Sequence, residues 1–332
     1  MVKLGIESIS DLRLGTSQVQ AAYLGDELVW SNYVPPGEFW GLCFTAEEPN
    51  AVIAMSSEGT PPSLDLLYST NASTWSTFTP GTTAVTLANV GDKVWLKAGQ
   101  NGNNGTASST SDGWRFSLTN KVAASGSIMS LINGDQETYA ISQNYAFHKL
   151  FNGCSALTQP PDLPATTITN TCYGDMFRQC TSLTRSPDLP ALSCADSCYA
   201  NMFRDCTSLS SAGSLSATTV VHDSYVSMFE GCTKLSAAPY LPAKSLNSTC
   251  YAFMFRNCSS LASISVEFSA WTSMGTYIWV AGVSSSGTFY CPYQLGTNAT
   301  ITRGTSNCPT NWNVVNTNVT YDIQSIGRTT SD

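Results

Sequence analysis

Two aspartates of this 332-residue chain, Asp162 and Asp188, stand 26 residues apart in a region whose residue pattern repeats with that period. If each period forms one layer of a stack with its strands in register, the two carboxylates lie about 4.8 Å apart. Retaining glycosidases cleave a glycosidic bond with two carboxyl groups at a similar separation, and repulsion between them raises one pKa. Asp205 and Glu230 are further candidates. A repeat also brings equivalent residues together without any catalytic role, and we expect the protein not to be an enzyme.

Other reactive side chains are scarce or lack partners. The two histidines, His148 and His222, fall on repeat segments where we expect them at the surface, away from any catalytic thiol. Cys194 and Cys198 lack the two further well-spaced ligands that a zinc site needs. The motifs of serine hydrolases, nucleotide-binding loops, zinc proteases and dinucleotide-binding folds are absent. We therefore expect no catalytic residues, no metal and no cofactor.

These residues belong to a repeat that runs from about residue 146 to residue 261. Each repeat unit carries a phenylalanine, a cysteine three residues later and a leucine three residues after that. A fixed period between about 20 and 50 residues is typical of stacked repeat proteins, in which each unit buries its apolar face against its neighbours. The five triplets are Phe151-Cys154-Leu157, Phe177-Cys180-Leu183, Phe203-Cys206-Leu209, Phe229-Cys232-Leu235 and Phe255-Cys258-Leu261.

Within one unit, apolar residues recur at i, i+1, i+4, i+5 and i+8 from Cys172 to Cys180. This spacing places them on one face of a short helix of about two turns. The segment from Leu183 to Leu189 alternates towards a period of two, which indicates a short strand that ends at Pro190. The unit is therefore predicted to consist of a helix, a turn, a short strand and a second turn.

The strand of each unit predicts an exposed row of side chains. The leucine before the Pro-Ala step should point inward and the residue before it outward, because strand side chains alternate. Carboxylates that accept hydrogen bonds from sugar hydroxyls, beside an aromatic platform, suit a neutral glycan. The alternative is a solvated row without a ligand. The inward residues are Leu163, Leu189, Leu215 and Leu241, and the outward residues are Asp162, Asp188, Ser214 and Tyr240.

The segment Phe177-Arg178-Gln179-Cys180-Thr181-Ser182-Leu183 resembles the BspA-like, or Treponema-type, class of leucine-rich repeat. With Asp188-Leu189-Pro190-Ala191 after it, the unit is similar to a longer variant found in surface proteins of gut Bacteroidales and in their phages. The third unit departs from this variant, with Ser214-Leu215-Ser216-Ala217 and with Ser224 in place of a cysteine. The resemblance implies a leucine-rich-repeat solenoid.

Twelve cysteines leave three interpretations open. Ten of them lie between Cys154 and Cys291, most of them on the predicted helical stripe. Small apolar thiols that stack unit on unit explain this pattern, and we favour this interpretation. Disulfide bonds and a metal site are the alternatives.

Residues 1–33 carry short apolar bursts that predict a three-stranded meander, with its last two strands joined at Gly25-Asp26. So small a sheet needs a partner surface. The segment resembles an N-terminal attachment module of phage virion proteins, and the alternative is a hairpin that packs on the next domain. The resemblance implies attachment through Leu14, Tyr23, Leu24, Leu28 and Trp30.

The rest of the chain completes four predicted regions. Residues 38–125 carry short strand-like segments that predict a β-sandwich, and Gly91-Asp92-Lys93-Val94-Trp95 resembles part of an immunoglobulin-like module. Residues 126–268 are the repeat solenoid, and residues 269–332 are a C-terminal cap and tail. The expected fold class is mainly β with short helices: a β-meander anchor, an immunoglobulin-like β-sandwich, and a leucine-rich-repeat α/β solenoid with a C-terminal cap.

Composition limits the partners. Charged residues make up only 11% of the chain and the net charge is −8, which argues against nucleic acid, because phosphate binding needs clustered Lys and Arg. No run of about 18 apolar residues is present, so we expect no membrane insertion. The N-terminal residues lack the apolar core of a signal peptide, which argues against export by that route.

We therefore expect a structural and adhesive protein of a phage virion, a tail or head fibre that is made in the host cytoplasm and displayed on the particle surface. Residues 1–33 would bind other virion proteins, and the repeat domain would bind a host-surface glycan or protein. A homo-oligomer is compatible with this role. The alternatives are a bacterial cell-surface adhesin of the same repeat family and, less favoured, a polysaccharide depolymerase.

Overall fold

The computed structural model describes residues 13–14, 17–18, 21–24, 27–31, 39–136 and 138–317. The chain divides into two compact units, Met1–Trp40 and Gly41–Asp332. The described chain is mainly β, and its helices are the single-turn α1 (Ser130–Asn133) and the 3-10 helix η1 (Tyr293–Leu295). No helix within these ranges is long and apolar enough to cross a membrane.

The described residues of the first unit form four short strands. They are β1 (Arg13–Leu14), β2 (Ser17–Gln18), β3 (Ala21–Leu24) and β4 (Glu27–Ser31). The antiparallel pairing of β3 with β4 confirms the hairpin predicted across residues 25 and 26. The prediction of a single three-stranded meander is wrong, because the two-residue strands β1 and β2 form a sheet of their own.

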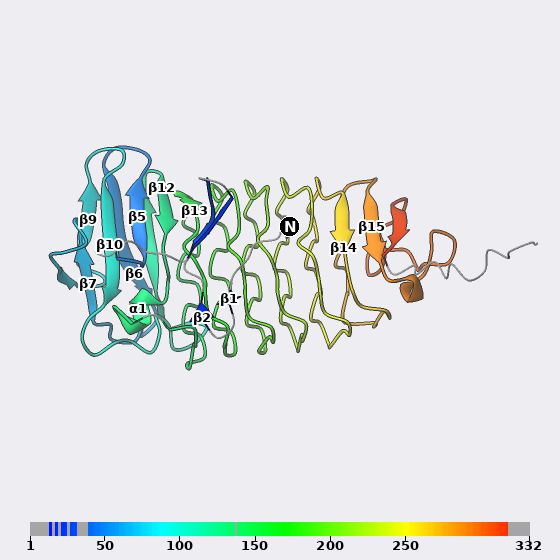
Figure 1. Ribbon diagram of the computed structural model, residues 1–332, viewed down its shortest axis with the longest axis horizontal. Coiled ribbons are helices and arrows are strands. Elements are labelled where there is room, and N and C mark those ends of the chain that lie inside the picture. Colours follow the sequence, from blue (N-terminus) through cyan, green and yellow to red (C-terminus); the bar gives the residue numbers. More distant parts are fainter. Residues whose placement is uncertain are drawn as a thin grey trace, which may run out of the picture. The chain divides into compact units, whose positions relative to one another are not determined.

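The second unit begins with strands from two sheets (Figure 1). They are β5 (Cys43–Ala46), β6 (Ala51–Glu58), β7 (Leu66–Ser69), β8 (Ser76–Phe78), β9 (Ala84–Leu87), β10 (Lys93–Ala98), β11 (Gly113–Thr119), β12 (Val122–Ser125) and, after α1, β13 (Leu157–Gln159). One sheet has the order β13-β12-β5-β10-β7-β8 and the other β11-β6-β9. Alternating burial along β6 and β10 gives each strand an apolar face. Phe44 of β5 meets Phe116 of β11 at 5.0 Å between ring centroids, which joins the two sheets.

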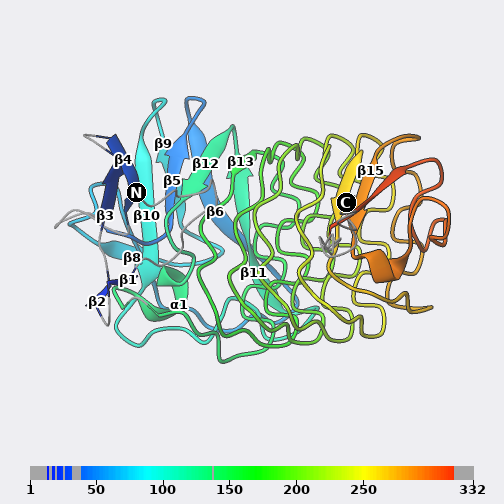
Figure 2. The ribbon, with the colours of Figure 1, turned by 45° about the vertical axis from the view of Figure 1, so that its right-hand side comes forward.

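The larger sheet continues past residue 125, where the boundary between sandwich and repeats was predicted. β12 pairs in parallel with β13, the strand of the first repeat unit. Parallel bridges then link later units, and the series ends in a sheet of β14 (Ser263–Ser265), β15 (Thr288–Cys291) and β16 (Asn313–Asn316). Figure 2 shows the units side by side between these sheets. The first sheets therefore cover one end of the repeats through backbone hydrogen bonds.

The helix predicted in each repeat unit is wrong. In segment 171–180 the amides alternate: Met176 donates to the Tyr173 carbonyl in its own unit, and Phe177 donates to the Met202 carbonyl of the next unit. Every fourth residue has a positive φ, which ends helical geometry and closes a short turn. Successive four-residue turns produce the same i, i+4, i+8 spacing as a helix, so both explain the sequence pattern. The residues with positive φ are Thr171 (56°), Asp175 (53°) and Gln179 (63°).

Two columns of stacked aromatic rings fill the core of the repeats. Phe177 and Phe203 lie 5.4 Å apart with 3° between their planes, and Phe203 and Phe229 lie 5.6 Å apart. These separations are within the favourable range for aromatic pairs. The phenylalanine column begins on Phe116 of β11 and ends on Trp279. The second column consists of Phe147, Tyr173, Tyr199, Tyr225 and Tyr251.

A column of cysteines runs beside the phenylalanines. All twelve cysteines are free and buried, and hydrogen bonds between layers confirm that the five periodic repeat thiols stack. Each thiol of this column donates to a carbonyl of the preceding layer, as Cys206 does to the Phe177 oxygen at 3.0 Å. Burial raises the pKa of Cys154 to about 12, so this thiol stays protonated at neutral pH. The other pairs are Cys154–Phe116, Cys180–Phe151, Cys232–Phe203 and Cys258–Phe229.

The last repeat is covered by residues of the predicted C-terminal cap. Trp279, Phe289 and Trp312 are buried, and the Trp279 ring lies 5.9 Å from that of Phe255. Arg303 ties the following loop together, because its guanidinium donates to the Trp312 carbonyl at 2.9 Å. The tail after residue 317 lies outside the described residues.

Candidate functional site

The four residues predicted to point outward lie in one exposed row. Each precedes a leucine that is at most 4% exposed, which confirms the predicted outward and inward positions. The strand predicted from Leu183 to Leu189 is wrong, because this segment makes only isolated parallel bridges to the next repeat unit. The bridge between Leu189 and Leu215 holds adjacent units in register at this level. We call the row Asp162, Asp188, Ser214 and Tyr240 the outward row.

Asp188 links two neighbouring repeat units through hydrogen bonds. One of its carboxylate oxygens, Oδ1, accepts hydrogen bonds from the Ser214 amide and from the Ser214 hydroxyl, each at 2.7 Å. Asp162 is exposed, and desolvation by its surroundings nevertheless raises its pKa; Arg185 opposes the shift and Asp188 adds to it. Asp188 thus acts on the charge of Asp162 and is itself engaged by Ser214.

Tyr240 supplies the aromatic end of the outward row. Its side chain is 49% exposed, so a ligand could reach part of the ring. Desolvation, and then a hydrogen bond to Glu267 and its charge, raise the pKa of Tyr240 to about 12. The phenol thus stays protonated at neutral pH and is held by Glu267 of the following strand region.

A second row of residues stands three positions before the outward row in each repeat unit. Arg185 donates to Gln159 Oε1 at 2.5 Å, and its parallel partner on the next unit is Ser211. Ala237 and Ser263 continue this line. The surface therefore changes along the stack from a charged part to a part with short side chains beside an aromatic ring.

Gly213, between the bridged residues Ser211 and Leu215, is required by a close backbone approach. A Cβ at this position would lie 2.4 Å from the Pro187 carbonyl oxygen. The Gly213 amide donates instead to the buried Ser186 hydroxyl at 2.8 Å. The third unit, which departs from the repeat pattern, thus keeps its register through Ser186 and Asp188 of the preceding unit.

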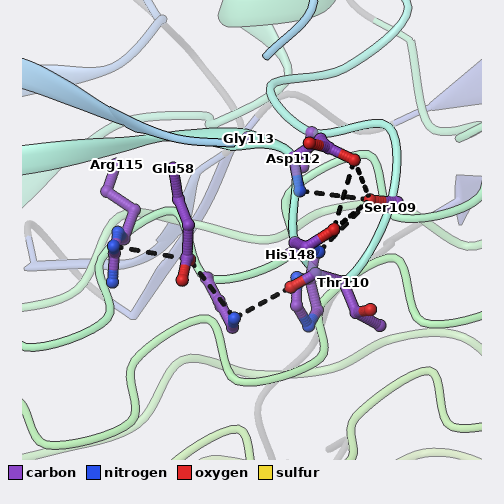
Figure 3. A pocket seen from close by; sticks show the side chains of 10 residues that line it. Glu58, Ser109, Thr110, Asp112, Gly113, Arg115 and His148 are labelled. Atoms are coloured by element: carbon purple, nitrogen blue, oxygen red, sulfur yellow. Dashed lines mark hydrogen bonds and ion pairs between the residues drawn. The ribbon is translucent and has the colours of Figure 1, made fainter. Parts of the chain in front are cut away.

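A second polar cluster lies between the first sheets and the first repeat unit (Figure 3). Glu58 forms ion pairs with Arg115 at 3.4 Å and with Lys149 at 3.3 Å. Asp112 accepts hydrogen bonds from the Thr60 amide and from the Ser109 hydroxyl, and these bonds lower its pKa. The cavity among these residues measures about 10 Å³, which is room for one water molecule at most. We interpret this cluster as a joint that fixes the loop after β10 to the repeats.

His148 lines the same cavity and corrects one expectation. It is only 4% exposed, whereas the sequence predicted a surface residue. Its ring packs edge-on against Tyr145 and its Nε2 atom lies 3.7 Å from Asp175 Oδ2. The next unit has Gly174 at the equivalent position, which leaves space for the imidazole. His222 is exposed, as predicted.

A buried ion cluster was missed by the sequence analysis. Glu230, whose side chain is 5% exposed, lies between arginines of the two neighbouring units. It is 3.5 Å from Arg204 Nη2, and Arg256 Nε donates to it at 2.7 Å. The available signal was the break in the Phe-Arg pattern at Phe229-Glu230, where the carboxylate separates like charges. Glu230 and Asp205, both considered for glycan cleavage, are paired with these arginines.

The residues predicted to attach the chain to a virion lie on strands of the first compact unit. Leu14, Tyr23, Leu24, Leu28 and Trp30 lie on β1, β3 and β4. Their side chains are outside the described residues. For metals, no group of three or more His, Cys, Asp or Glu side chains within the described ranges is arranged to hold an ion.

No family model, curated protein or solved structure matches the chain. The geometry of the outward row and of the stacked units therefore carries the functional argument.

Proposed function

We propose that the chain is a structural and adhesive protein of a phage virion, a tail or head fibre. In this proposal residues 1–33 bind other virion proteins, and the outward row contacts a glycan or a protein on the host surface. The finer fold belongs to the same proposal: an immunoglobulin-like sandwich followed by a BspA-like leucine-rich-repeat solenoid. A bacterial cell-surface adhesin of the same repeat family is the alternative.

The observation that carries the proposal is the contrast between the core and the outward row. The buried positions repeat the same residue types from unit to unit, as in Phe177, Phe203 and Phe229. The outward positions change from acid to hydroxyl to aromatic on the same frame. Exposed residues that vary on a fixed scaffold are typical of binding surfaces. Carboxylates and hydroxyls beside an exposed ring suit sugars, which offer hydroxyl groups and apolar ring faces.

The first test concerns attachment. Virions produced with a chain that lacks residues 1–33 should contain none of it, while the purified truncated chain stays folded, because Gly41–Asp332 forms a compact unit of its own. Mass spectrometry of purified particles measures incorporation, and circular dichroism measures folding. The full chain with Leu192→Ala, a change at an exposed residue of the second repeat unit, serves as the control and should be incorporated normally. Truncated chain in the particles would place the anchor elsewhere, and full-length chain in the envelope of uninfected bacteria would favour the adhesin.

The second test concerns the outward row. Asp188→Ala combined with Tyr240→Ala should weaken binding to host surface polysaccharide by about tenfold or more, through loss of a stacking ring and of hydrogen-bond acceptors. The melting temperature should fall only slightly, because both side chains are exposed and the lost contacts are the hydrogen bonds of Asp188 with Ser214 and of Tyr240 with Glu267. Adsorption to host cells and binding to isolated polysaccharide measure the effect.

The control for this double variant is Leu192→Ala combined with Thr207→Ala, which removes exposed side chains outside the outward row. This control should bind like the unchanged chain. Undiminished adsorption by the Asp188 and Tyr240 variant would remove the outward row as the contact surface. Shortening of the polysaccharide during incubation would instead favour a depolymerase.

A further inference from the structure

One unit of the repeat has an additional cysteine. Cys194 stands where the equivalent positions of other units carry Ile168, Val220 and Leu246. One period after Cys198, Ser224 stands in place of a cysteine in the next repeat unit. The additional thiol of Cys194 therefore lies beside Ser224, the position at which the next repeat unit lacks a cysteine.

The backbone brings Cys194 and Cys198 to the same corner. The Cys198 amide donates to the Ala195 carbonyl at 3.2 Å, and Ser197 has a φ of 53°, so the chain closes a tight turn between the two cysteines. The thiol of Cys198 and the hydroxyls of Tyr225 and Ser224 are the neighbours that act on the Cys194 sulfur, and the Cys198 thiol also donates to the Ser224 carbonyl at 3.9 Å. These groups form one buried polar cluster between two units.

Cys194 is buried like the other cysteines, but it is the most exposed of them and differs from them in acidity. It is 9% exposed, and the next most exposed cysteine is Cys43 at 5%. The hydrogen bond from Cys198 is the main cause of a lowered pKa of Cys194; burial opposes it, and Tyr225 and Ser224 add to it. Burial raises the pKa of each of the other eleven cysteines. Oxidation-sensitive cysteines are typically accessible, deprotonated and next to a second thiol.

We propose that Cys194 and Cys198 are a site of reversible oxidation, at which peroxide reacts with Cys194 and Cys198 then closes a disulfide, while the other ten cysteines stay reduced. In the first step the Cys194 thiolate attacks hydrogen peroxide, the O–O bond breaks, and a sulfenic acid and hydroxide form. In the second step the Cys198 sulfur attacks the Cys194 sulfur, the S–S bond forms and the S–O bond breaks. The two thiols lose two electrons in total, and peroxide is reduced to two molecules of water.

The inference does not depend on the proposed function, and it can be tested on the purified full chain. Brief alkylation of the folded protein should label Cys194 at least about tenfold faster than Cys180, because only the thiolate reacts. Trypsin separates the two sites, since residues 186–204 contain Cys194 and Cys198 and residues 179–185 contain Cys180. After treatment with hydrogen peroxide, the peptide 186–204 should lose about 2 Da, and a reductant should restore its mass.

Neighbouring units supply matched variants. Cys194→Val copies Val220 and should abolish both the fast labelling and the loss of mass. Cys198→Ser copies Ser224 and should keep a reactive Cys194, which then accumulates as a sulfenic acid trapped by dimedone. Equal labelling of Cys194 and Cys180 in the unchanged protein would overturn the proposal. A peptide 186–204 that keeps both thiols after peroxide treatment would overturn it as well, and neither result depends on a variant that folds.

Discussion

Phe203→Ala is expected to lower the free energy of unfolding by about 3–5 kcal/mol, the range for removing a buried aromatic side chain. Phe203 is fully buried, with Phe177 and Phe229 stacked on its two faces. The spacing between units is fixed by backbone hydrogen bonds, such as that from the Phe203 amide to the Met228 carbonyl. The neighbouring rings therefore cannot close the gap that alanine leaves, and the cavity adds to the lost burial.

Chemical denaturation followed by circular dichroism measures this loss. Leu192→Ala, which truncates a side chain that is 64% exposed, is the control and should change the free energy of unfolding by less than about 0.5 kcal/mol. A loss below about 1 kcal/mol for Phe203→Ala would contradict a continuous ring column. The gap also weakens the contact between the two halves of the stack, so unfolding should become less cooperative.

Glu230→Ala should lower the free energy of unfolding by about 2–3 kcal/mol. The substitution leaves Arg204 and Arg256 without the carboxylate that lies between them. Removal of one partner from a fully buried ion pair costs about 3–5 kcal/mol, but the two arginine side chains are 31% and 35% exposed, so solvent reduces the effect.

Two further variants separate charge from shape. Asp205→Ala removes an acid that lies 3.8 Å from Arg204 but is 43% exposed, and it should cost less than about 1 kcal/mol. Glu230→Gln keeps the shape and removes the charge, and its deficit should shrink at high salt, because ions screen the repulsion between the arginines. Equal losses of unfolding free energy for Glu230→Ala and Asp205→Ala would contradict the larger contribution that we assign to the buried carboxylate of Glu230.

The sequence was sufficient to predict which residues are buried and that the repeat units stack. It was not sufficient to predict the hydrogen bonds between the units. The period of Phe203 and Cys206 predicted stacked layers, because identical spacing places equivalent side chains together. The predicted helix failed because four-residue turns and a helix share an apolar spacing. The difference lies in amides such as Phe177, whose acceptor is on another unit and is absent from any local pattern.

For the candidate site, alternation along a strand was enough to predict which side chains are exposed. It was not enough to predict what those side chains bind within the protein. Asp188 is held by Ser214, and Tyr240 is held by Glu267, because the register between units is a property of the assembled stack. The burial of Glu230 has the same origin, since its arginines are contributed by both neighbouring units.

The hydrogen bonds between units have an evolutionary consequence. Each unit offers its successor nearly the same amides, carbonyls and ring surface that it receives from its predecessor, as the bonds from Cys180 to Phe151 and from Cys206 to Phe177 show. In-frame recombination between two such units in the gene therefore joins surfaces that already fit. A chain shortened or lengthened by whole units keeps its core and acquires a new order of exposed residues. The gene can thus change the order of the exposed residues in a single step, and the encoded units still fit one another.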